Sequence, residues 1–152
     1  MEIRPHRPKD FQQLTELRWL LKTEDDPTVS EDKKANFQTA YFNQLHFSEK
    51  LGDTVHFVID DAPKIAGALT IRIVRKELAP VSEASSWGYL TNTYVTNECR
   101  GRGLGSKLLN NAIAWARENQ LELLIVWPSE RSYSFYRAAG FCGESDPLEL
   151  VL

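Results

Sequence analysis

The stretch VTNECRGRGLGSKLLNNAIAWAREN, residues 95–119, joins an extended segment to a helix through a turn rich in glycine. Its arginines and glycines alternate: Arg100, Gly101, Arg102, Gly103 and, after one leucine, Gly105. The first N–H groups of a helix have no partner within the helix and lie at the positive end of its dipole. Since glycine lets a ligand approach the backbone closely, this turn predicts a binding site for an anion, above all a phosphate.

Two common phosphate-binding motifs do not fit this turn. A P-loop requires glycine immediately before its lysine, but Ser106 precedes Lys107. A dinucleotide-binding fingerprint that starts at Gly101 requires glycine or alanine at position 106, where serine stands. The strand before the turn is also the fourth that we expect in the chain, after an antiparallel hairpin, which is the wrong place for a dinucleotide fold.

The segments around the turn predict an α/β protein with helices and strands in the order β-α-α-β-β-β-α-β-α-β. After a short extended start, Asp10 is the expected cap of a helix to about Thr23, and Ser30 that of a second helix. Residues 54–60 and 64–76 are rich in β-branched residues and predict a hairpin, and 87–96 predict the next strand.

After the turn, an apolar stripe from Leu104 to Ala116 predicts a long helix. Residues 121–127 are almost continuously apolar, as expected of a strand covered on both faces. Ser129 is the expected cap of a short helix that Gly140 ends, and the tail from 140 to 152 predicts one or two last strands. With no repeat or linker, residues 1–152 are expected to form a single domain.

Composition sets limits on the partners of the protein. The net charge of −3 gives no general attraction to nucleic acid or to an anionic membrane, so an anion site has to be local. No apolar run reaches the length of a membrane span, and the first residues lack the apolar centre of a signal peptide. Cys99 and Cys142 predict neither a metal site nor a disulfide framework, which favours a cytoplasmic protein with reduced thiols.

The segment from Arg100 to Gly105 resembles the [Gln/Arg]-x-x-Gly-x-[Gly/Ala] signature of the GNAT superfamily, the Gcn5-related N-acetyltransferases. YLTNTYV before it resembles the fourth strand of that family, and ERSYSFYRAAGF resembles a later helix that carries a tyrosine and ends in Gly-Phe. The opening IRP and the IAGAL segment also resemble the family, so the resemblance covers nearly the whole chain.

The resemblance implies a central mixed, mostly antiparallel sheet flanked by about four helices, with splayed fourth and fifth strands. It also implies acetyl-CoA as co-substrate and no metal. The pantetheine arm would pair with the strand at Tyr94, Val95 and Thr96, and Ser129 and Ser132 would add cofactor contacts. Ser129 departs from the asparagine that many members carry at this place. The pyrophosphate would bind the backbone amides of the turn: Arg100, Gly101, Arg102, Gly103, Leu104, Gly105 and Ser106.

Acyl transfer from a thioester to an amine needs a donor to the carbonyl oxygen and an acid for the leaving thiolate. The backbone N–H near Val95 is the candidate donor. Tyr136 matches the general-acid tyrosine of the family, four residues before Gly140, and can also contact the cofactor. A phenol with a pKa near 10 can protonate a thiolate with a pKa near 8.5. Tyr133, one turn earlier, is an alternative acid.

We therefore expect an acetyl-CoA-dependent N-acetyltransferase that acts on a primary amine of a small molecule or a protein. The alternative is a non-catalytic acyl-CoA-binding regulatory module with the same fold. No general base is evident. The acidic loop of Glu24, Asp25 and Asp26 could favour a cationic amine or could simply be solvated, and Trp19, Trp87 and Trp127 are candidates for an acceptor pocket. Homodimers are common in the family and are a possible state here.

Overall fold

The computed structural model describes the chain except residues 25, 27, 81–85 and 144–152. Its centre is a 5-stranded sheet in the order β1-β2-β3-β4-β5. The strands are β1 (Glu2–Pro5), β2 (Thr54–Asp61), β3 (Lys64–Arg75), β4 (Ser86–Val95) and β5 (Leu124–Val126). The helices are α1 (Phe11–Thr23), α2 (Lys34–Leu51), α3 (Leu104–Glu118) and α4 (Tyr133–Ala138), with short 3-10 turns at Pro8–Asp10, Glu31–Lys33, Asn97–Cys99 and Glu130–Ser132.

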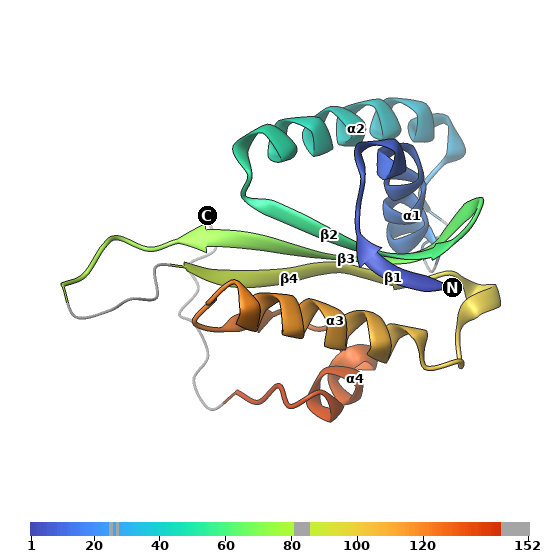
Figure 1. Cartoon of the computed structure of the whole chain (residues 1–152). Coiled ribbons are helices and arrows are strands. Elements are labelled where there is room, and N and C mark those ends of the chain that lie inside the picture. Colours follow the sequence, from blue (N-terminus) through green and yellow to red (C-terminus); the bar gives the residue numbers. More distant parts are fainter. Residues whose placement is uncertain (25, 27, 81–85, 144–152) are drawn as a thin grey trace.

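The sheet is mixed and mostly antiparallel. Strands β1 to β4 pair in antiparallel order, and β5 alone runs parallel to its neighbour β4. Helices α1 and α2 cover one face of the sheet, and α3 and α4 lie on the other (Figure 1). This arrangement confirms the predicted α/β architecture with four helices.

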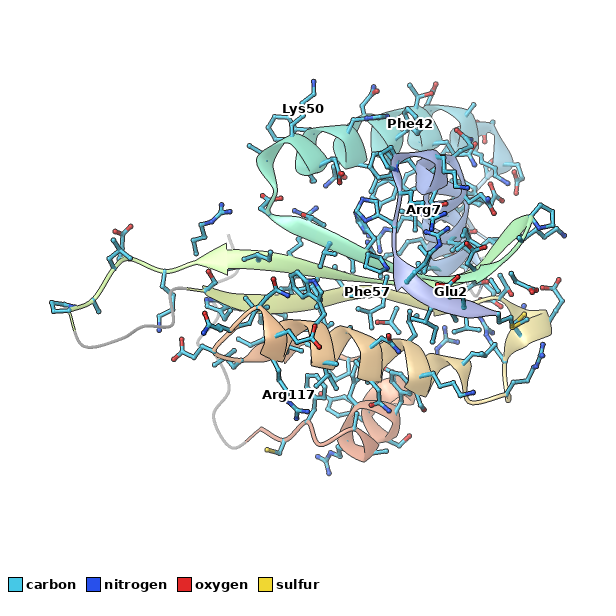
Figure 2. The ribbon with its side chains drawn as sticks, viewed as in Figure 1. Glu2, Arg7, Phe42, Lys50, Phe57 and Arg117 are labelled. Atoms are coloured by element: carbon cyan, nitrogen blue, oxygen red, sulfur yellow. The ribbon has the colours of Figure 1, made fainter. Side chains whose placement is uncertain are left out.

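Each face of the sheet carries its own apolar core (Figure 2). The larger core lies under α3, whose stripe buries the predicted residues Leu104, Leu108, Leu109, Ala112 and Ala116. Phe57 of β2 belongs to this layer, where its ring meets Trp115 edge-on at 5.9 Å. The smaller core joins Phe11, Leu14 and Leu17 of α1 to Leu45 of α2. The sheet is therefore held from both sides by independent apolar layers.

A buried ionic network fixes α1 to the sheet. The Arg4 guanidinium of β1 donates through Nη1 to Asp10 Oδ2 at 2.7 Å and through Nε to Asp60 Oδ2 at 2.7 Å. Arg4 and Asp10 are only 7% and 2% exposed. Asp10 also accepts from the backbone N–H of Arg7 at 2.7 Å. The network fixes the residue just before α1 relative to the edge strand.

The three predicted helix caps need correction, because in each case the side chain is used elsewhere or makes no capping bond. Asp10 has helical φ and ψ and closes the turn before α1 instead of capping α1. Ser30 precedes a 3-10 turn and makes no side-chain capping bond, so α2 begins only at Lys34. Ser129 places its Oγ 3.0 Å from Ser132 Oγ instead of capping the helix that follows.

Strand β5 is shorter and less covered than its composition predicts. Only Leu124–Val126 pair with β4, and all three residues are half-buried. Leu123 and Trp127 beside them are 44% and 50% exposed, so this apolar run is not enclosed on both faces by the described residues. The predicted last strands fall largely in 144–152, outside the described residues. Within the described chain, none of the helices is long and apolar enough to cross a membrane.

Replacing Arg4 by methionine should destabilise the fold strongly, because Asp10 would keep a buried charge without its cation. We expect a loss of about 3–5 kcal/mol in the free energy of unfolding, the usual cost of breaking a buried ion pair from one side. Urea unfolding at neutral pH measures it. Arg117→Met, which changes an exposed side chain of α3 (Figure 2), is the matched control and should stay within about 0.5 kcal/mol of the parent. Equal midpoints for the two variants would contradict a stabilising role for the network.

Candidate active site between the fourth and fifth strands

Strands β4 and β5 separate partway along their length. Their parallel pairing covers Gly88, Tyr89 and Leu90 of β4 and stops at the pair Leu90 with Val126. Pro128 follows two residues later, and proline cannot donate to a strand ladder. Strand β4 nevertheless continues to Val95, and among the described residues this part of it pairs only with β3. The splay of these two strands agrees with the predicted fold.

A β-bulge interrupts β4 at the point where the strands part. Thr70 of β3 lies opposite Thr91, whereas Ala68 lies opposite Tyr94, so Leu69 faces both Asn92 and Thr93. Asn92 has a φ of 54°, in the left-handed region that asparagine adopts more readily than most residues.

Two side chains hold the amide of Asn92 in place. Its Oδ1 accepts a hydrogen bond from Arg18 Nη1 of α1 at 2.5 Å. Its Nδ2 donates to the Tyr41 hydroxyl of α2 at 2.9 Å. Burial raises the pKa of Tyr41 above its ordinary value, so this phenol stays protonated at neutral pH. Both helices on this face of the sheet therefore fix the bulge.

The bulge turns the backbone of Val95 away from β3. Thr96 N–H donates to the Ala66 carbonyl of β3 at 2.9 Å. Because backbone polar groups alternate between the two sides of a strand, the N–H and C=O of Val95 point to the splayed side. The Val95 carbonyl accepts there from Arg100 Nε at 2.9 Å. Three residues were expected to meet a pantetheine arm, and Val95 is thus the one whose backbone groups point to the splayed side of β4. The N–H of Thr96 is instead bonded within the sheet.

Tyr136 reaches the bulge from the opposite wall. Its hydroxyl donates to Thr93 Oγ1 at 3.0 Å, and the side chain is 6% exposed. Burial raises the pKa of Tyr136 above its ordinary value of 10.0, which keeps the phenol protonated at neutral pH. Tyr133, the alternative acid, is 48% exposed and does not line the cleft.

The glycine-rich turn has the backbone conformation that an anion site requires. Gly101 and Gly103 have φ values of 72° and 70°, where other residues are strained. Gly103 is the residue before α3, and no side chain among the described residues caps that helix. A Cβ added at either glycine would meet no atom within 4 Å, so the approach to the backbone is open. A ligand can therefore approach the backbone of the turn at both glycines.

The Arg100 side chain folds back from the turn toward α1. Its Nη2 donates to Glu24 Oε2 at 2.7 Å, and its guanidinium lies 5.2 Å from the Tyr94 ring centroid. The hydrogen bond from Arg100 lowers the pKa of Glu24 below its ordinary value. Burial and the Glu24 carboxylate raise the pKa of Tyr94 to about 12. Glu24 is therefore an ionised partner of Arg100, and Tyr94 stays a neutral phenol.

These elements enclose a cleft of about 400 Å³ between α1, β4 and the segment from Val126 to Tyr136. Of the predicted site residues, Tyr94, Val95, Gly105, Ser129, Ser132 and Tyr136 line it. Thr96 and the rest of the turn lie outside the lining of the cleft: Arg100, Gly101, Arg102, Gly103, Leu104 and Ser106.

The candidates for an acceptor pocket are divided by the structure. Of the tryptophans, Trp127 lines the cleft, whereas Trp19 is buried against Phe37. Of the acidic loop, Asp25 lies outside the described residues and Asp26 bonds to Thr28.

Sequence reasoning missed several residues of the cleft, among them Arg18, Asn92 and Thr93. A signal existed for Asn92, since asparagine is depleted in strands and tolerates the left-handed conformation of a bulge. No sequence pattern marks Arg18 or Thr93, because their roles depend on contacts across the fold.

Solved structures with this fold include acetyltransferases. A predicted acetyltransferase of Clostridium acetobutylicum with acetyl-CoA is 18% identical, with a TM-score of 0.78 over 99% of this chain and 95% of that one. A GCN5-related N-acetyltransferase of Ralstonia eutropha JMP134 is 19% identical, with a TM-score of 0.78 over 99% and 97%. Glucosamine-6-phosphate N-acetyltransferase of Arabidopsis thaliana is 20% identical, with a TM-score of 0.73 over 99% and 97%. No curated protein matches the chain in sequence.

These similarities show that the chain shares the mixed α/β fold of those structures. The family model described as "Acetyltransferase (GNAT) family" matches residues 11–141, and the chain belongs to this family.

Replacing Gly103 by valine should strain the turn, because a β-branched residue at a φ of 70° is disfavoured. We expect a loss of about 1–2 kcal/mol in the free energy of unfolding, measured with urea. Gly143→Val is the matched control: it adds the same side chain where no positive φ occurs and no atom lies within 4 Å. Equal effects of the two substitutions would argue against a strained turn at Gly103.

Proposed function

We propose that this chain transfers the acetyl group of acetyl-CoA directly to a primary amine of a small molecule or a protein. One observation carries the proposal: the bulge in β4 directs the Val95 backbone into the same cleft in which Tyr136 bonds to Thr93. A strand N–H and a protonated phenol then face one cleft, which leads to an open glycine turn. Membership of an acetyltransferase family supports the same reaction.

The residues present fit coenzyme A. The amides from Arg100 to Ser106 would hold the pyrophosphate, since the turn is open and its helix end lacks a side-chain cap among the described residues. The Val95 N–H and C=O would pair with the pantetheine arm, which requires the Val95 carbonyl to exchange its bond to Arg100. Ser129 and Ser132 lie on the opposite wall and offer hydroxyl groups to the same arm.

The chain supplies two groups that the chemistry needs. Val95 N–H would donate to the thioester oxygen as negative charge develops on it, the usual means of lowering the barrier to acyl transfer. Tyr136 would give its proton to the departing sulfur, because a raised phenol pKa keeps that proton available at neutral pH. Thr93 would hold the hydroxyl of Tyr136 in the cleft until then.

A non-catalytic acyl-CoA-binding module is the second candidate. It would need the glycine turn and the splayed strands but not a buried phenol at the reacting end. The enclosed Tyr136 with a hydroxyl partner favours the enzyme over this module.

Titration of the protein with coenzyme A, followed by incubation with acetyl-CoA and a panel of amines, tests both candidates. The enzyme predicts a higher melting temperature with coenzyme A, because a ligand that binds only the folded state stabilises it, and it predicts amine-dependent release of free thiol. Stabilisation without thiol release across the panel would favour the module. No stabilisation at coenzyme A concentrations far above a plausible Kd would contradict both.

Tyr136→Phe should lower kcat by about 10²- to 10⁴-fold with little change in the affinity for acetyl-CoA, as expected when a general acid is lost. Free-thiol release at saturating acetyl-CoA measures kcat, and a binding titration measures affinity. Tyr133→Phe removes the same atom from an exposed tyrosine one turn away and should leave both unchanged. An undiminished kcat for Tyr136→Phe, or an equal loss in both variants, would remove Tyr136 as the acid.

A further inference from the structure

The cleft is basic although the chain as a whole is acidic. The net charge of the chain is −3, yet Arg18, Lys22 and Arg131 line the cleft and no carboxylate does so among the described residues. Of the acidic residues that the structure describes from α1 to position 26, Glu16 pairs with Lys34, Glu24 pairs with Arg100, and Asp26 accepts a hydrogen bond from Thr28. The charged side chains in the described lining of the cleft are therefore all cationic.

Arg18 brings a positive charge to the reacting end of the cleft. Its Nη1 binds Asn92, the residue next to Thr93, and Thr93 holds the Tyr136 hydroxyl at 3.0 Å. The glycine turn, in contrast, begins beyond the end of β4 and is separated from Asn92 by the rest of the strand. Arg18 thus lies beside the bulge that holds Tyr136, whereas the amides suited to the phosphates of coenzyme A come after the end of β4.

Lys22 lies one turn of α1 after Arg18 and lines the same cleft. Neither residue forms an ion pair with a carboxylate among the described residues. Arg18 is half-buried and Lys22 is exposed, so the two cations extend from inside the cleft to its mouth. A ligand that enters on the α1 side meets both charges before it reaches Tyr136.

We propose that the acyl acceptor is an amine that also carries an anionic group, a carboxylate or a phosphate ester, which Arg18 and Lys22 bind. The inference rests on the proposed acetyl transfer and names its substrate class. The guanidinium of Arg18 keeps N–H groups beyond the one given to Asn92, and a charge-assisted bond to an anion is the strongest that such a group forms. A polycationic amine would be repelled from the same wall.

Matched pairs of amines test this class by release of free thiol from acetyl-CoA. The pairs are β-alanine with propylamine, tyrosine with tyramine, and O-phosphoethanolamine with ethanolamine, with spermidine as the polycation. We expect kcat/KM about 10- to 100-fold higher for the anionic member, the worth of one charge-assisted hydrogen bond. Comparison of the carboxylate and phosphate pairs identifies which anion is preferred. A preference for the amines that lack an anionic group, or for spermidine, would overturn the inference.

Substitutions of Arg18 and Lys22 separate their role in binding the acceptor from other effects of their positive charge. Arg18→Gln should abolish the preference for amines with an anionic group, mainly by raising the KM of those amines, and should leave the KM of acetyl-CoA unchanged. Arg18→Lys keeps the positive charge and should restore part of the preference. Lys22→Gln, at an exposed residue outside the bulge, should lower the preference several-fold without altering the fold. Arg117→Gln changes the same charge on α3 and should have no effect.

Two results would overturn the assignment of these cations. If Arg18→Gln lowered kcat equally for amines with and without an anionic group, Arg18 would support the structure of the bulge and would not bind the acceptor. A higher KM for acetyl-CoA in either variant would assign the cations to the cofactor phosphates. Absence of thiol release with every amine would contradict the acetyl transfer itself, a failure distinct from turnover without a preference for anions.

Discussion

The β-bulge at Asn92 and Thr93 is the constraint on which the site depends. Before it, Leu90 faces the core under α3; after it, Tyr94 faces the core under α1. One extra residue in a strand reverses which side chains face each side, and it also reverses which backbone groups enter the ladder. Without it, Val95 would pair with β3 and the end of β4 would offer no backbone donor to the cleft. The left-handed Asn92 supplies this reversal.

The first helix connects the bulge to the anion-binding turn. Arg18 of α1 holds Asn92, and Glu24 just after α1 holds Arg100 at the start of the turn. The buried contact of Arg4 with Asp10 fixes the beginning of the same helix. Helix α1 and the residue that follows it therefore contact both the bulge of β4 and the start of the turn. A cofactor phosphate at the turn and an acceptor near Asn92 would then both bind next to residues that α1 holds in place.

Local patterns in the sequence predicted most of the fold, because apolar periodicity and glycine spacing are local properties. The stripe from Leu104 to Ala116 predicted α3, and the run from Arg100 to Gly105 predicted an open turn before it. The three helix caps were wrong, since Asp10, Ser30 and Ser129 find other partners or none. Arg18 and Thr93 could not be predicted, because residues 74 and 43 positions away in sequence, Asn92 and Tyr136, define their positions.

The positive cleft also bears on the lack of a visible general base. An amine attacks a thioester only in its neutral form, and most amines are protonated at neutral pH. Nearby positive charge disfavours an ammonium ion and lowers its pKa, so any cationic charge of the cleft that the anionic group of the acceptor leaves uncompensated would favour the neutral form of its amine. The anionic group of an acceptor would have to lie against the cations while the amine points toward Tyr136. The same charges would then select the acceptor and help to deprotonate it, which reduces the demand for a carboxylate base in the cleft.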